Sequence, residues 1–264
     1  MDYKIRLTLW LIVIFIIVNC ITVVSAASVN IWPIDPIIEY KDNTTSLWLE
    51  NLDKQDILLQ IRIYSWKQKN NNFLLKKQND ILVSPPIVLI KSHHKQLIRL
   101  VKIINPLPYE ERSYRIIIDE IPRLNDLKDI NQQKNKLKLQ IRYSIPFFGY
   151  GPNIQSSSNT IYPLDNNLSI FSPKLHYYII NKNNKQYLHI RNDGYVHAKL
   201  SEVDFKDKKN QYLMKEEFLG YILPGNEISF PISQSLTGSE ILTARINNQE
   251  KIQTIPFFIS IKQQ

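Results

Sequence analysis

The sequence predicts an all-β protein made of two sandwich domains. Short runs of alternating or β-branched residues recur along the chain, bounded by Asn, Asp, Pro and Gly, which is typical of antiparallel sheets. No stretch with helical periodicity and capping residues competes with these runs. The chain has 264 residues, enough for one large domain or two ordinary ones.

Residues 1–26 have the features of a secretory signal. Lys4 and Arg6 precede an apolar run that ends at Val18, and small residues follow up to Ala27. This order of basic, apolar and small segments is typical of a removable export signal. We therefore expect a mature chain that begins near Ala27 and has no stable membrane insertion. A retained signal anchor is the alternative, since the apolar run is almost long enough to span a bilayer.

Composition excludes several function classes. Cys20, the only cysteine, would leave with the signal, so we expect no disulfide, no thiolate nucleophile and no thiolate metal ligand. The chain is basic, with a formal net charge of +9. Its lysines are scattered among apolar strands and Asn-rich turns, without a Gly-rich phosphate loop or an RNA-binding aromatic motif. We therefore expect no nucleic-acid partner.

An enzymatic function is also not expected. The paired acids Asp119-Glu120 and Glu110-Glu111 are adjacent residues, and adjacent side chains on a strand point to opposite faces. No Gly-x-Ser-x-Gly elbow is present. The histidines have no zinc-like spacing, at His93, His94, His176, His189 and His197. The sequence thus predicts neither catalysis nor a cofactor.

The first domain, residues 27–148, is expected to contain about seven strands. That number suits one immunoglobulin-like sandwich. The predicted strands are Val29–Ile38, Ser46–Glu50, Ile57–Trp66, Ile87–Ile90, Gln96–Ile103, Tyr114–Ile121 and Leu137–Phe148.

A domain boundary is predicted at the linker 149–155, where the first glycines of the chain stand beside Pro152. A second sandwich is expected over residues 156–264, which leaves an interdomain cleft. Gly194 and Gly225 lie in turn sequences where glycine can take a positive φ. The predicted strands are Lys174–Ile180, Gln186–Arg191, Ala198–Phe205, Ile228–Ile232, Ile241–Ile246 and Ile255–Ile261.

The most informative segment is Lys136–Ile145, at the end of the first domain. Strict alternation puts its apolar side chains on one face, namely Leu137, Leu139, Ile141, Tyr143 and Ile145. An ordinary half-buried strand would explain this pattern. The segment also follows a polar loop, Asn125 to Asn135, so an edge position is equally compatible. An exposed apolar edge is an aggregation hazard unless another protein covers it.

Several motifs, in order, carry a resemblance to a known family. The chain resembles the PapD-like periplasmic pilus-assembly chaperones, and among them the archaic chaperone–usher branch. The motifs extend over nearly all of the mature chain. They are Ile31-Trp32-Pro33-Ile34-Asp35-Pro36, Leu47-Trp48-Leu49-Glu50-Asn51, Ser84-Pro85-Pro86, Gln96-Leu97-Ile98-Arg99-Leu100, Glu111-Arg112-Ser113-Tyr114-Arg115, Asp119-Glu120-Ile121-Pro122, Asn192-Asp193-Gly194-Tyr195-Val196-His197 and Gly220-Tyr221-Ile222-Leu223-Pro224-Gly225.

The resemblance implies a function. It implies an ATP-independent chaperone of the Gram-negative periplasm that binds, folds and caps pilus or fimbrial subunits by donor-strand complementation. The subunits would then pass to an outer-membrane usher. The donated side chains would be Leu137, Leu139 and Ile141, with Tyr143 or Ile145 as an extension of the row.

The family also holds the subunit's C-terminal carboxylate with paired basic residues, and here the chain departs from the pattern. Asp35 stands at the first-strand position where classical members carry Arg, and the basic residue expected late in the donor strand falls on Ile145-Pro146. We therefore consider Arg115 and Arg142 as the carboxylate anchor, with pairing to acids inside the fold as the alternative.

Two further residues are assigned structural roles. Glu111 resembles the family residue that fixes domain orientation by a salt bridge, and Arg99 is expected to pair internally. An exposed donor row would also favour self-association of the free protein. The alternative from another function class is a secreted immunoglobulin-like structural or adhesive surface protein.

Overall fold

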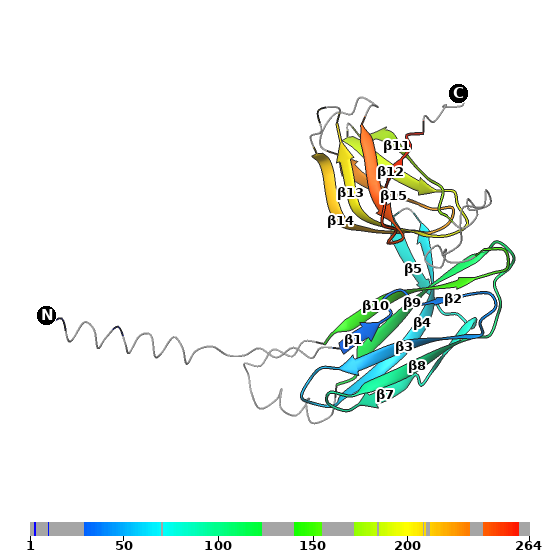
Figure 1. The fold of residues 1–264 in the computed structure, drawn as a ribbon, viewed down its shortest axis with the longest axis vertical. Coiled ribbons are helices and arrows are strands. Elements are labelled where there is room, and N and C mark those ends of the chain that lie inside the picture. Colours follow the sequence, from blue (N-terminus) through cyan, green and yellow to red (C-terminus); the bar gives the residue numbers. More distant parts are fainter. Residues whose placement is uncertain are drawn as a thin grey trace.

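The computed structural model describes residues 29–69, 71–122, 140–154, 172–183, 185–207, 209, 212–232 and 240–258, together with Tyr3 and Trp10. From Val29 on, every regular element in these ranges is a β-strand. The strands form two sandwiches, one above the other in Figure 1, so the predicted all-β, two-sandwich fold is confirmed. No helix in these ranges has the length and apolar character needed to cross a membrane.

The first sandwich consists of two sheets around an apolar core that includes Leu49, Ile98 and Ile116. One sheet has the strand order β1-β3-β8-β6, and the other has β2-β10-β9-β4-β5, with β7 also paired to β4. The strands are β1 (Val29–Trp32), β2 (Ile37–Ile38), β3 (Thr44–Asn51), β4 (Ile57–Lys69), β5 (Asn72–Lys76), β6 (Ile81–Ser84), β7 (Ile87–Ile90), β8 (Lys95–Lys102), β9 (Glu111–Glu120) and β10 (Arg142–Tyr150).

The second sandwich is built in the same way around a core that includes Leu188, Leu200 and Phe205. Its sheets have the orders β11-β12-β15 and β14-β13-β16-β17. The strands are β11 (Leu175–Lys182), β12 (Lys185–Asn192), β13 (Ala198–Lys206), β14 (Tyr212–Ile222), β15 (Glu227–Ile232), β16 (Ile241–Ile246) and β17 (Ile252–Ile255).

The predicted first strand, Val29–Ile38, is not continuous. β1 pairs antiparallel with β3 in one sheet, whereas β2 pairs parallel with β10 in the other. The two prolines between them, Pro33 and Pro36, have no N–H group to donate to a ladder. The chain therefore crosses from one sheet to the other at this point, which brings β2 to the end of β10.

Three observed strands were not predicted, because their buried alternating rows are short, interrupted or absent, and β17 shares only Ile255 with the predicted strand Ile255–Ile261. All five residues of β5 are exposed, β6 spans only Ile81–Ser84, and β14 contains the polar run Lys215-Glu216-Glu217. A strand that buries little apolar surface leaves a weak pattern in the sequence.

The two glycine turns differ from each other. Gly225 has a φ of 70°, as predicted. Gly194 does not have a positive φ, so that prediction is wrong. Glycine is needed there for another reason, because a Cβ would lie 2.6 Å from the backbone N of Lys174. The position of Gly194 thus reflects a close approach between two backbone segments.

The two sandwiches share a buried apolar cluster. Trp66, Phe148, Tyr150 and Ile154 contact Val196, Tyr221 and Leu223 of the second sandwich. Phe148 and Tyr150 belong to β10, which continues to Tyr150 and so extends two residues into the range predicted as a linker.

Candidate functional site

β10 lies near the edge of its sheet. It pairs with β9 along its whole length. On its other side it pairs with β2 only at Phe148 and Gly149. Within the described ranges, the outer edge of β10 from Arg142 to Phe147 thus has no strand neighbour.

The direction of the outer backbone groups follows from one hydrogen bond. The N–H of Phe148 donates to the carbonyl of Pro36 across the outer edge, at 3.2 Å. Backbone groups alternate between the two edges of a strand, so Pro146, Ser144 and Arg142 also present theirs outward. Pro146 has no N–H, in keeping with the preference of proline for edges. Ser144 and Arg142 therefore offer both a donor and an acceptor to a further strand.

The side chains of β10 that point inward belong to the core of the first sandwich. Ile145 and Phe147 are buried, and Tyr143 packs partly buried against the same core. The hydroxyl of Tyr143 accepts a hydrogen bond from the N–H of Val29, at 3.1 Å. Tyr143 thus contacts its own sandwich in this structure, although it was predicted to extend the donated row.

The other residues of the predicted row lie before β10. Ile141 directly precedes the strand and is half-buried. Leu137 and Leu139 lie outside the described residues, as does the polar loop Asn125 to Asn135. The assignment of these side chains to a donated row stays a prediction.

Arg142 has an acidic partner within the fold. Its Nε lies 2.5 Å from Oδ1 of Asp119, and Arg62 binds Oδ2 of the same carboxylate. Burial disfavours the charged carboxylate, but the hydrogen bonds from Arg142 and Arg62 outweigh it and lower the pKa of Asp119. Asp119 therefore joins the start of β10 to β4 through two guanidinium groups.

Arg115 on β9 has a different environment. Its Cζ lies 3.8 Å from the ring centroid of Trp66 and 5.8 Å from that of Tyr221 in the second sandwich. No carboxylate of the described residues forms an ion pair with it. Burial lowers the pKa of Arg115, opposed by the nearby Tyr221. A partly buried guanidinium held between aromatic rings is suited to bind an anion from another molecule.

The structure does not bring Arg115 and Arg142 together. Arg115 lies opposite Pro146 in the β9–β10 ladder, whereas Arg142 lies opposite Asp119. The two positions are four residues apart along β10, which corresponds to about 13 Å of strand. Arg142 binds Asp119 in this arrangement, whereas Arg115 lies beside Trp66.

The two residues assigned structural roles lie in contrasting places. Oε2 of Glu111 accepts hydrogen bonds from the backbone N–H and the Nδ1 of His197, each at 2.9 Å, and so connects the two sandwiches. Arg99 is exposed on β8 between Ser46 and Ser84. The internal ion pair expected for Arg99 is not found among the described residues.

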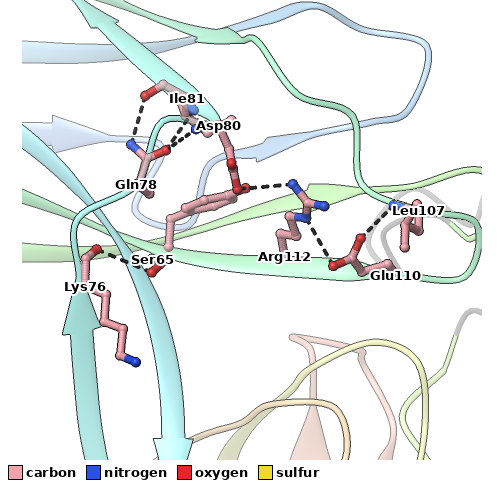
Figure 2. A network of polar contacts seen from close by, with 9 residues as sticks. Ser65, Lys76, Gln78, Asp80, Ile81, Leu107, Glu110 and Arg112 are labelled. Carbon is pink, nitrogen blue, oxygen red and sulfur yellow. Dashed lines mark hydrogen bonds and ion pairs between the residues drawn. The ribbon is translucent and has the colours of Figure 1, made fainter.

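A polar network that was not predicted borders the junction of the sandwiches (Figure 2). Arg112 binds Glu110 at 3.1 Å and Asp80 at 3.2 Å, and the hydroxyl of Tyr114 donates to Asp80. Burial of Glu110 is outweighed by hydrogen bonds from Arg112 and the N–H of Leu107, which lower its pKa. Of these residues, only Arg112 and Tyr114 belong to a motif noted in the sequence. Asp80 belongs to none, so the network could not be predicted.

This network lines a groove of about 660 Å³ between the two sandwiches. On another side of the junction, Nζ of Lys199 lies 3.2 Å from Oδ2 of Asp35. Asp35, which stands where the resemblance implied an arginine, thus has a basic partner in the second sandwich. The predicted cleft is therefore present, and Arg112 is among the residues that line it.

Known proteins resemble this chain in sequence. The family model for the pili and flagellar-assembly chaperone, PapD N-terminal domain, matches residues 29–154. The chaperone protein CssC of Escherichia coli is 26% identical over 202 residues, which cover 75% of this chain and 77% of CssC.

Solved structures agree with these matches. A chain in the crystal structure of the CsuC–CsuE chaperone–tip adhesion subunit pre-assembly complex, from the archaic chaperone–usher Csu pili of Acinetobacter baumannii, aligns with a TM-score of 0.69. It is 29% identical, and the alignment covers 88% of this chain and 100% of that one. The Pseudomonas aeruginosa CupB2 chaperone aligns with a TM-score of 0.58 over 87% of this chain and 100% of its own. At 11% identity it supports the fold alone.

Proposed function

Because this chain belongs to the PapD-like pilus-assembly chaperones, in their archaic chaperone–usher branch, we propose that it caps pilus subunits by donating a strand. The donor strand consists of β10 and the apolar row that precedes it. The observation that carries this proposal is the outer edge of β10, which has no strand neighbour from Arg142 to Phe147 among the described residues. The family is one of chaperones, not of enzymes.

Strand donation has a direct physical rationale. A pilus subunit that lacks one strand of its sandwich exposes its core and unpaired edges. The outward groups of Ser144 and Arg142 would pair with such an edge, while Leu137, Leu139 and Ile141 would fill the groove. Full burial of each apolar side chain contributes about 1.5 to 3 kcal/mol. At an outer-membrane usher, the extension of the next subunit would replace the donated strand of the chaperone. Because the new strand fits the subunit better, this transfer requires no ATP.

Arg115 is the better supported of the two candidate anchors for the subunit's C-terminal carboxylate. It has no acidic partner among the described residues, whereas Arg142 already binds Asp119. A charge-assisted hydrogen bond from Arg115 would contribute about 1.5 to 3 kcal/mol.

The location follows from the family, whose pilus chaperones act in the periplasm. We propose that residues 1–26 direct export in a Gram-negative bacterium and are then removed.

The proposal is tested by co-expression of residues 28–264, directed to the periplasm by a removable export signal, with subunits encoded by neighbouring reading frames. Wild type is expected to retain a soluble subunit in a periplasmic pull-down, and the Leu139→Asp/Ile141→Asp variant is expected to lose it to degradation. The matched control is Leu82→Asp/Ile103→Asp. It changes two exposed apolar residues in or next to the sheet that does not contain β10, and it should retain the subunit.

If wild type and Leu139→Asp/Ile141→Asp retain equal amounts of subunit, strand donation through these side chains is overturned. If no folded form retains any subunit, the protein instead fits an immunoglobulin-like surface protein. That reading also predicts polymerisation or retention at the cell surface, whereas a chaperone purifies as a soluble monomer or a one-to-one complex.

A further inference from the structure

Among the described residues, the sheet that contains β10 has another unpaired edge at its opposite end. Its strand order is β2-β10-β9-β4-β5, so β9 and β4 separate β10 from β5. Of the strands that the structure describes, β5 pairs with β4 alone, through the hairpin that reaches toward the second sandwich in Figure 1. A partner on β5 would therefore not compete with a partner on β10.

β5 exposes an unusual amount of apolar surface for an edge strand. Phe73, Leu74 and Leu75 are 61%, 40% and 45% exposed. The carbonyl of Lys76 accepts a hydrogen bond from Ser65 on the β4 side. Because backbone groups alternate along a strand, Phe73 and Leu75 present their N–H and C=O groups to solvent. This edge is a ready template for strand addition.

The charge around β5 selects the kind of partner. Lys67, Lys69, Lys76 and Lys77 are all exposed, and none forms an ion pair with a carboxylate of the described residues. Lysines commonly protect an edge from pairing with another copy of itself. Here a second copy would bring the same lysines and the same excess of basic residues, so like charges would oppose it. An acidic strand would instead be attracted.

The β4–β5 hairpin is also held in place by the second sandwich. The side-chain amide of Asn71 donates to the carbonyl of Ser229 at 2.6 Å and accepts from its N–H at 2.8 Å. A partner strand would therefore meet a hairpin whose tip is already fixed, which reduces the entropy lost on binding.

We propose that β5 binds an extended acidic segment of a partner protein by strand addition, while β10 is occupied by its own partner. The proposal does not depend on strand donation by β10. Its recognition elements are the outward backbone groups of Phe73 and Leu75, the apolar side chains beside them and the four surrounding lysines.

The test uses the full mature chain and a short fluorescein-labelled peptide of alternating valine and glutamate. Fluorescence anisotropy should show binding that weakens as salt is added. Leu75→Pro removes one outward N–H and should weaken binding about tenfold, a loss of about 1.4 kcal/mol. Lys69→Glu/Lys76→Glu should have a similar effect, whereas Lys41→Glu/Lys91→Glu, with two exposed lysines elsewhere, should not.

Two results would overturn the proposal. Equal binding of a peptide N-methylated at alternate residues would show attraction by charge alone, without backbone pairing. Sedimentation that shows wild-type dimers, dissociated by Leu75→Pro, would assign the edge to a second copy of the chain. If Leu75→Pro does not fold, the lysine variants decide the outcome. Subunit pull-down with the same variants should be unchanged.

Discussion

Glu111 on β9 accepts two hydrogen bonds from His197 in the second sandwich, one from the backbone N–H and one from Nδ1, each at 2.9 Å. The side chain of Glu111 is completely buried. Phe148 of β10 stacks on the imidazole of His197, with ring centroids 3.5 Å apart and planes 9° from parallel. Glu111 and the end of the proposed donor strand thus contact the same residue of the second sandwich, His197.

Replacement of Glu111 by Ala should destabilise the protein by about 1 to 3 kcal/mol, because it leaves two partly buried N–H groups of His197 without their acceptor. Urea unfolding measures the change. Glu202→Ala is the matched control, since the ion pair of Glu202 with Arg245 is exposed, and it should have a much smaller effect. Equal effects would contradict the role of Glu111 in joining the sandwiches.

Two amide side chains should contribute unequally to the same junction. Gln68 is buried, donates to the carbonyl of Tyr221 at 2.6 Å and accepts from the N–H of Leu223 at 2.8 Å. Gln68→Ala should cost about 1 to 3 kcal/mol, because two buried backbone groups lose their partner. Asn71 is exposed, so water can replace its contacts and Asn71→Ala should cost less. Unfolding curves that place Asn71→Ala lower in stability would refute this order.

The ion pairs of Asp119 with Arg62 and Arg142 predict that the stability of the fold depends on pH. Hydrogen bonds from Arg142 and Arg62 outweigh burial and lower the pKa of Asp119 in the folded state. Its contribution is therefore complete above the ordinary carboxyl range and is lost as the pH falls through the lowered pKa. Asp119→Asn should destabilise the protein at pH 7 by about 1 kcal/mol, since Arg142 is exposed and Arg62 is partly exposed to solvent.

The difference between wild type and Asp119→Asn should shrink toward zero in strongly acidic urea titrations. A difference that stays constant from neutral to acidic pH would show that charge pairing at Asp119 is not its cause.

Arg115→Met should weaken subunit capture about tenfold or more, as expected for the loss of a charge-assisted hydrogen bond. The quantity to measure is the dissociation rate of a purified chaperone–subunit complex. Arg99→Met removes an exposed arginine from the opposite sheet and should leave this rate unchanged. Equal rates for wild type and Arg115→Met would exclude Arg115 as the anchor.

Much of the fold could be predicted from the sequence, because most strands bury one alternating face. Ile57–Trp66 and Ala198–Phe205 are examples, and both are strands in the structure. The division of Val29–Ile38 between two sheets could not be predicted, since its prolines are compatible with either a bent strand or a crossing. β5 was missed because it buries no apolar face.

Less of the site could be predicted. Alternation shows which residues share a face, but it does not show whether the outer edge of a strand is paired. The partners of Arg142 and Arg115 depend on contacts between strands distant in sequence, and both were therefore left open. The sequence does indicate Glu111, through its motif, but not the position of His197 beside it.

Strand donation is tested most directly by hydrogen exchange of the β10 amides, with and without bound subunit. The account predicts that the N–H groups of Arg142 and Ser144 exchange rapidly in the free protein and become protected in the complex. Those of Tyr143 and Ile145, which face β9, should be protected in both. Unchanged exchange at Ser144 in a stable complex would contradict pairing of the subunit with this edge.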